Sequence, residues 1–200
     1  MKRLYLFILI AFFQLSIVCA QDAKTVLEKC ASVVGDATGI QASFVMESAQ
    51  YGNMSGTIVV KGKKFHATTA VATMWFDGTT QWTYLKSNDE VSVTTPNETQ
   101  QQALNPYNFI NMYKSGFKYT MSTAASDYKV HLTSTDAKRK IQELFITINK
   151  NGYIPTEVKL RQGTKWTTFT ISNFKKGSFP DSEFCFNPKD YPSAEVIDLR

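Results

Sequence analysis

The chain has 200 residues, with 22 Lys or Arg against 17 Asp or Glu, so its formal net charge at pH 7 is +5. This length is typical of one domain with a substantial core. The small positive surplus gives no argument for nucleic-acid binding. The densest basic run, Lys138-Arg139-Lys140, is typical of a solvated hairpin tip.

The first twenty residues have the three regions of a signal peptide. Lys2 and Arg3 are positive, residues 4–18 are apolar, and Val18-Cys19-Ala20 is a small-residue cleavage signal. The segment is too short for a membrane span, which needs about 20 apolar residues. The branched Val18 also disfavours lipid attachment to Cys19. We therefore expect an exported chain that is cleaved after about Ala20, which lowers the formal net charge to +3.

The next segment has helical periodicity. Asp22 can cap its start and Gly35 can end it. Apolar residues recur at spacings of three and four, and they predict one stripe that packs against a sheet: Ala23, Val26, Leu27, Cys30, Ala31 and Val34.

After Gly39 the apolar residues recur at every second position, which predicts strands. The central stretch is a meander over residues 74–96, in which Asp77-Gly78 is typical of a tight turn and Trp82 and Tyr84 share one face. About eleven short strands separated by turn residues predict a mainly β, α+β fold. The pattern indicates an antiparallel sandwich or barrel rather than a parallel α/β sheet.

Two short helices are predicted in mid-chain. Asn97 is a candidate cap for residues 98–104, and Asn105 with Pro106 begins a second helix over residues 105–113. We expect the second helix to be a lid on the apolar face of the sheet, because it carries four large apolar side chains: Phe109, Ile110, Met112 and Tyr113.

The apolar face of the predicted sheet needs a cover, and the three predicted helices are short. Either sheet and helices fill one another as a solid core, or they leave a cavity that suits lipid. In the second interpretation the cavity is lined by apolar residues of the alternating strands: Phe44, Met46, Ile58, Val60, Phe65, Trp82, Tyr84, Phe117, Tyr119 and Ile146.

Two cysteines remain after cleavage, Cys30 and Cys185. An oxidising compartment would permit a disulfide between them. Two buried, inert thiols are an equally good interpretation, because cysteine is among the most buried residue types.

The sequence has no motif that indicates catalysis. His66 and His131 both lie inside alternating strands, and Asp77 is typical of a turn residue. Nucleophile elbows, metal-protease motifs, phosphate-binding loops and dinucleotide fingerprints are missing from the sequence. We therefore predict a protein that is not an enzyme and that uses no metal or cofactor.

Several short motifs follow one another along residues 22–199: Trp75-Phe76-Asp77-Gly78 with Gln81-Trp82-Thr83-Tyr84, Leu104-Asn105-Pro106, Gly152-Tyr153-Ile154-Pro155, Phe169-Thr170-Ile171-Ser172-Asn173, Phe184-Cys185-Phe186-Asn187-Pro188 and Ala194-Glu195-Val196-Ile197-Asp198. In this order they resemble the LolA-type outer-membrane lipoprotein carriers. The resemblance implies a half-open antiparallel β-barrel whose mouth is covered by helices, formed by residues 21–200 as a single domain.

The resemblance also implies a function and partners. The family carries the acyl chains of lipoproteins through the periplasm in an apolar cavity, between inner-membrane release machinery and an outer-membrane acceptor, and we expect a monomer. Many members have a basic residue followed by proline after the strand that corresponds to residues 57–61. This chain has Lys61-Gly62-Lys63-Lys64 without proline, so Lys63 is the candidate stand-in that influences how cargo is held and released.

Two other functions remain open from the sequence, because a fold does not fix a function. One is a lipid binder or envelope sensor with the same barrel. The other is a secreted β-sandwich hydrolase or adhesion module with a filled core.

Overall fold

The computed structural model describes residues 23–50, 52–97, 109 and 111–200. The predicted signal peptide, the predicted helix over residues 98–104 and Ile110 lie outside these residues. Of the predicted lid, residues 109 and 111 are helical, and a 3-10 turn, η1 (Met112–Lys114), follows them.

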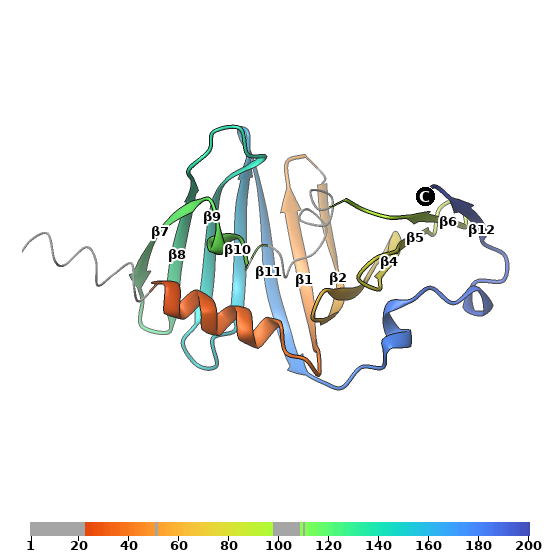
Figure 1. Cartoon of the computed structure of the whole chain (residues 1–200), viewed down its shortest axis with the longest axis horizontal. Coiled ribbons are helices and arrows are strands. Elements are labelled where there is room, and N and C mark those ends of the chain that lie inside the picture. Colours follow the sequence, from red (N-terminus) through yellow and green to blue (C-terminus); the bar gives the residue numbers. More distant parts are fainter. Residues whose placement is uncertain (1–22, 51, 98–108, 110) are drawn as a thin grey trace, which may run out of the picture.

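Twelve strands of the described residues form one sheet (Figure 1). They are β1 (Ile40–Ser48), β2 (Gly52–Lys61), β3 (Lys64–Thr69), β4 (Ala72–Phe76), β5 (Gln81–Leu85), β6 (Glu90–Thr94), β7 (Phe117–Thr123), β8 (Asp127–Ser134), β9 (Ile141–Asn149), β10 (Pro155–Gln162), β11 (Lys165–Lys176) and β12 (Glu195–Asp198). Their order is β12-β6-β5-β4-β3-β2-β1-β11-β10-β9-β8-β7, so the sheet is not closed. Neighbours are antiparallel except β12 and β6, which are parallel. The predicted half-open, mainly β barrel is therefore confirmed.

Turn residues end the strands where the sequence predicts. Asp77 accepts hydrogen bonds at Oδ1 from the backbone N–H groups of Thr79 (2.8 Å) and Thr80 (2.7 Å). Gly78 follows with φ +104°, a conformation that suits glycine because it has no Cβ. Asp77 is therefore a turn residue that joins β4 to β5.

The helix over residues 23–34 covers one half of the sheet. It crosses in front of β7–β11 in Figure 1. All six residues of its predicted stripe are buried, and Leu27 and Cys30 are fully buried against a core that includes Leu144 and Ile146. This half of the molecule has a filled core.

In the other half of the sheet, the outer face of β3–β5 is covered by a segment that we name the C-terminal strap, residues 177–194 (Figure 1). The strap contains two 3-10 turns, η2 (Asp181–Phe184) and η3 (Pro188–Asp190). The Asp181 carboxylate pairs with the ammonium groups of Lys61 (3.1 Å) and Lys64 (2.8 Å). These pairs hold the start of the strap to the β2–β3 hairpin.

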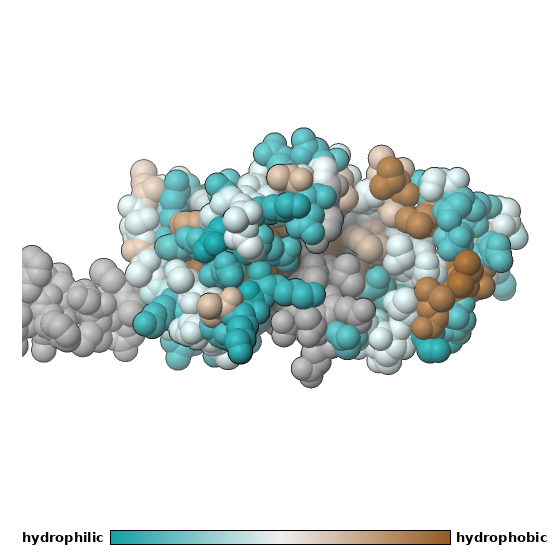
Figure 2. Space-filling view, turned by 90° about the horizontal axis from the view of Figure 1, so that it is seen from above, coloured by the Kyte–Doolittle hydropathy of each residue, from teal (hydrophilic) through white to brown (hydrophobic). Residues whose placement is uncertain are grey.

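Exposed large hydrophobic side chains lie mainly at the end of the molecule that the helix does not cover (Figure 2). Among the described residues, Val71 and Leu85 lie near the β4–β5 pair, and Val196 and Leu199 lie on or beside β12. None of the helices in the described part of the chain is both long and apolar enough to span a bilayer.

Candidate functional site

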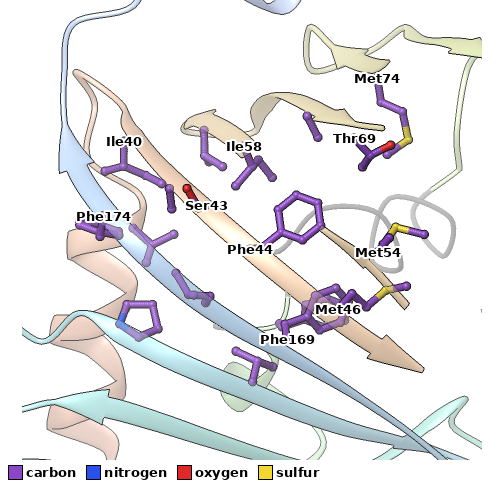
Figure 3. A pocket seen from close by; sticks show the side chains of 18 residues that line it. Ile40, Ser43, Phe44, Met46, Met54, Ile58, Thr69, Met74, Phe169 and Phe174 are labelled. Carbon is purple, nitrogen blue, oxygen red and sulfur yellow. The ribbon is translucent and has the colours of Figure 1, made fainter. Parts of the chain in front are cut away.

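An apolar cavity lies between β1–β4 on one side and β10–β11 on the other, with a volume of about 200 Å³ (Figure 3). All of its lining residues are apolar except Ser43 and Thr69. They are Val34, Ile40, Ala42, Ser43, Phe44, Met46, Met54, Ile58, Val60, Ala67, Thr69, Met74, Phe109, Pro155, Val158, Phe169, Ile171 and Phe174.

The two polar side chains of the lining already have protein partners. The Thr69 hydroxyl donates to the carbonyl of Ala72 (3.1 Å) and accepts from the Ala72 N–H (3.0 Å). The Ser43 hydroxyl accepts from the side-chain amide of Asn173 (3.2 Å). No charged side chain is among the lining residues, so the cavity matches hydrocarbon better than a polar ligand.

Alternation along adjacent strands builds the cavity wall. Ala42 of β1 lies opposite Ile58 of β2, and Ile58 lies opposite Ala67 of β3, which in turn lies opposite Met74 of β4. Directly opposite residues share a face of the sheet. The small side chains of Ala42 and Ala67 beside the larger Ile58 and Met74 leave space at this face.

Only the C-terminal end of the helix reaches this cavity. Val34, at its C-terminal end, is the only residue of the helical stripe among the lining residues. The filled core and the cavity therefore lie side by side on the same inner face of the sheet. They meet at Val34, Phe109 and Val158, which belong to both.

A β-bulge in β11 shapes one end of the cavity. Ser172 lies opposite Ser43 and Lys175 lies opposite Gln41, so β11 has one more residue than β1 between these two pairs. Asn173 takes up the extra residue with φ +53°. The bulge shifts the inward and outward alternation of the side chains by one residue. Phe174 therefore lines the cavity together with Phe169 and Ile171.

The structure brings five of the residues that we named from the sequence to this cavity. Phe44, Met46, Ile58 and Val60 line it as strand residues, and Phe109 of the expected lid lines it from above the sheet. Phe109 is 6% exposed, and its ring centroid lies 6.0 Å from that of Phe169. Whether they bind lipid stays a prediction.

Four other residues expected at the cavity lie on the inner face but do not line it. Phe117, Tyr119 and Ile146 belong to the core beneath the helix, and Phe65 is buried in a smaller cluster with Val60 and Phe76. The helix fills this part of the sheet, so the solid-core interpretation holds for β7–β10 and the cavity interpretation for β1–β4.

Trp82 and Tyr84 lie on the opposite face of the sheet, which corrects our expectation that they face the cavity. Trp82 lies directly opposite Trp75 in the β4–β5 pair, and Trp75 contacts the strap through Phe186 and Tyr191. Tyr84 packs on Tyr191, with ring centroids 4.6 Å apart. Aromatic side chains suit this outer face because the strap covers it.

Two further residues of the predicted lid belong to the filled core. Tyr113 is buried and Met112 is half-buried there, and neither lines the cavity. Lys63 is exposed in the β2–β3 turn, between the two lysines that bind Asp181. It does not line the cavity either.

The two cysteines are free, so the disulfide that the sequence left open is absent from the structure. Cys30 lies in the core beneath the helix, where burial raises the pKa of its thiol to about 12. Cys185 lies in the strap and its Sγ contacts the carbonyl of Asp181 at 3.7 Å.

Both histidines contact a glutamate on the outer face of the sheet. His66 Nδ1 lies 2.8 Å from Glu183 of the strap, and His131 Nε2 lies 2.8 Å from Glu143. Glu143 also pairs with Arg161 at 2.8 Å, and this guanidinium lowers the pKa of the Glu143 carboxyl. The described residues contain no group of His, Cys, Asp or Glu that could hold a metal ion.

The sequence interpretation missed several lining residues: Val34, Ala42, Met54, Ala67, Met74, Pro155, Val158, Phe169, Ile171 and Phe174. Alternation could have found Ala42 from Phe44, and Ile171 from Phe169. Phe174 gave no such signal, because an even spacing from Phe169 and Ile171 leads to Asn173 instead.

Comparison with known families adds to this geometry. Residues 13–164 match the family described as outer membrane lipoprotein carrier protein LolA. The chain belongs to this family. Comparison with curated proteins gives no match.

Solved structures share the LolA-like fold. An uncharacterized conserved protein from Thermus thermophilus is 11% identical with a TM-score of 0.60, and the match covers 88% of this chain and 99% of that one. MucB is 12% identical with a TM-score of 0.52, and the match covers 84% of this chain and 63% of that one. The Pseudomonas aeruginosa MucA/MucB complex gives 10% identity and a TM-score of 0.50, over 84% of this chain and 62% of that one. At these identities the likeness concerns the fold alone.

Proposed function

We propose that this protein is an exported carrier that shields the acyl chains of lipoproteins in the cavity and carries them through the periplasm toward the outer membrane. The observation that carries the proposal is the lining of the cavity, which is apolar apart from two hydroxyls with protein partners. Membership of the LolA family supports the same function.

The chemistry of the cavity favours a reversible hydrocarbon site rather than catalysis. Burial of hydrocarbon stabilises a complex by about 0.8 kcal/mol for each methylene. Ten buried methylenes would supply about 8 kcal/mol, which by itself corresponds to a micromolar dissociation constant, and ordering costs would make the net affinity weaker. Binding in this range suits a carrier, because cargo must also be released.

The Phe109 ring is positioned to compete with cargo. It is almost fully buried and packs on Phe169, which lines the cavity beside it. An acyl chain in contact with Phe169 would displace this ring, and the return of the ring would favour release. This competition would offset part of the binding free energy.

The rest of the proposal concerns the path of the cargo. Residues 1–20 would direct export and be removed, which leaves residues 21–200 as the mature monomer. Inner-membrane release machinery would load the carrier and an outer-membrane acceptor would unload it. Lys63, exposed near the Asp181 contacts of the strap, is the candidate for influencing this transfer.

A sensor that binds a protein partner is the second candidate. MucB, which shares this fold, has been solved in complex with MucA. The apolar cavity of this chain favours lipid as the ligand. A carrier and a sensor can be distinguished by what happens to lipoproteins when the protein is depleted from the cell. Depletion of a carrier would leave lipoproteins in the inner membrane, whereas depletion of a sensor would leave their sorting unchanged.

A matched pair of variants tests the cavity. Ala42→Phe places a ring inside it, because Ala42 is a buried lining residue of β1. Val45→Phe places the same ring on the outer face of the same strand, where Val45 is 45% exposed. We expect the wild-type protein and Val45→Phe to bind a fluorescent acyl probe and to transfer it to acceptor vesicles, and Ala42→Phe to do neither. Equal binding by both variants would show that the probe does not occupy this cavity.

A further inference from the structure

The cavity has a closed end and a more open end along β1. Ile40 and Val60, at the start of β1 and the end of β2, are 3% and 1% exposed. Met54 is half-exposed beside Met46 at the other end (Figure 3). The distance from Ile40 to Met46 is about 20 Å at a rise of about 3.3 Å per residue. A hydrocarbon chain would therefore lie along β1 and stop near Ile40.

Beyond Ile40 the backbone stays paired with the end of β11 and the start of the strap. The Gly177 N–H donates to the carbonyl of Gly39 (3.0 Å), and the Phe179 N–H donates to the carbonyl of Thr38 (3.4 Å). A Cβ at Gly39 would lie only 2.7 Å from the Phe179 ring, so the strap passes directly against this residue. This paired backbone, with the buried Ile40 and Val60, marks the end of the cavity that we take as closed.

Phe174 lies at this closed end, next to Ile40 in Figure 3. Its ring packs against both hydrophobic clusters of the molecule, so it stands at the junction of the filled core and the cavity. Phe169, on the same strand, lies at the opposite end beside Met46. The two phenylalanines are thus a matched pair at the two ends of one cavity.

The inward position of Phe174 depends on the bulge at Asn173. In an unbroken strand the residue after Ile171 that faces inward is Asn173, and Phe174 faces outward. Asn173 adopts φ +53° instead and donates its side-chain amide to the Ser43 hydroxyl of β1. Asparagine tolerates this left-handed conformation better than most residues. The bulge therefore places an aromatic ring where the regular strand would place an amide.

We propose that Phe174 is the specificity-determining residue that limits the length of the hydrocarbon chain, and that Asn173 is its positioning residue. This inference rests on the proposed function, because it assumes that the cavity holds a saturated acyl chain. The preferred ligands are then saturated chains whose terminal methyl group just reaches the Phe174 ring. Longer chains leave their additional methylenes outside the cavity.

A series of saturated fatty acids from laurate to stearate tests the proposal by titration against the mature protein. For the wild type, affinity should rise about fourfold for each added methylene up to a limiting length and then stay level, since only buried methylenes contribute. Phe174→Ala should move this limit to longer chains, and Phe174→Trp should move it to shorter ones. Phe169→Ala, at the other end, should leave it in place.

Asn173 has its own pair of variants. Asn173→Gly keeps the left-handed conformation and should keep the wild-type limit. Asn173→Val disfavours that conformation, so the strand should become regular, Phe174 should turn outward, and the limit should move as in Phe174→Ala. If Asn173 had only a structural role, both substitutions would lower the unfolding temperature, and the limiting chain length would stay unchanged.

The two proposals fail in different ways. If the wild-type protein binds none of the fatty acids, the proposed function itself is wrong. If it binds them with a limiting length that both Phe174→Ala and Phe174→Trp leave unchanged, the function stands and the assignment of Phe174 is wrong. Phe174→Trp retains a large ring, so it decides the question even where the alanine variant does not fold.

Discussion

A hydroxyl placed in the centre of the cavity should weaken hydrocarbon binding far more than it weakens the fold. Ile58 is 8% exposed, and its neighbours across β1 and β3 are Ala42 and Ala67, which have no polar side-chain atoms. Thr and Val have nearly the same shape, so Ile58→Thr and Ile58→Val differ mainly by one hydroxyl. The comparison of these two variants isolates the effect of a polar group on the wall.

The expected loss of affinity follows from the desolvation of the introduced hydroxyl. The empty cavity has space for a water molecule beside the hydroxyl of Ile58→Thr, but an acyl chain would take this space, and the side chains of the neighbouring alanines offer no hydrogen bond. An unsatisfied buried hydroxyl costs about 1–3 kcal/mol. The dissociation constant of Ile58→Thr should therefore exceed that of Ile58→Val by about 5- to 150-fold.

Calorimetric titration with palmitate measures this ratio, and urea unfolding of the same two variants provides the control. The free energies of unfolding should differ by less than the binding free energies, because the hydroxyl stays hydrated in the folded, empty protein. Dissociation constants within twofold of each other would refute the reasoning, since the chain would then not contact the wall at Ile58.

Three further predictions concern the rest of the molecule. Leu144→Ala should lower the free energy of unfolding by about 2–5 kcal/mol, because Leu144 is fully buried beneath the helix. Urea titration measures this loss, and the affinity for palmitate should not change. Asp181→Asn should lower the unfolding temperature at neutral pH. The ammonium groups of Lys64 and Lys61 lower the pKa of Asp181, so this stabilisation is present above its unfolded pKa of about 4 and is lost as the pH falls further. The unfolding temperatures of wild type and variant should therefore converge in acid. Cys30 should resist alkylation at neutral pH until the protein unfolds, since its pKa is raised to about 12, and mass spectrometry of iodoacetamide-treated protein checks this.

The sequence predicts which residues share a face of a strand better than it predicts which face is inside. Trp82 and Tyr84 do share a face, as the alternation of β5 indicates. Hydrophobicity alone suggested that this face was inside, but the strap buries aromatic residues on the outside. The strap comes from residues about a hundred positions later in the chain, and no local pattern in β5 indicates it.

The bulge in β11 shows a second limit. Phe169 and Ile171 set an alternation that excludes Phe174, and only the left-handed conformation of Asn173 brings Phe174 inside. Asparagine tolerates that conformation, but it is also common on the exposed faces of strands, so the residue type alone does not indicate a bulge. The helix, in contrast, was predictable, because the spacing of its six apolar residues directly defines the buried stripe.

The strap also explains how half of a sheet can remain hollow. A sheet needs at least one packed face to be stable. Strands β7–β10 pack their inner face on the helix, whereas β3–β5 pack their outer face on the strap, with Trp75 between His66, Phe186 and Tyr191. Packing on the outside adds to the stability of β3–β5, so their inner face, which is packed around Phe65 and Phe76, can leave space beside Met74. Loss of the strap should therefore affect the cavity before the filled core, because the strands that form one wall of the cavity depend on it.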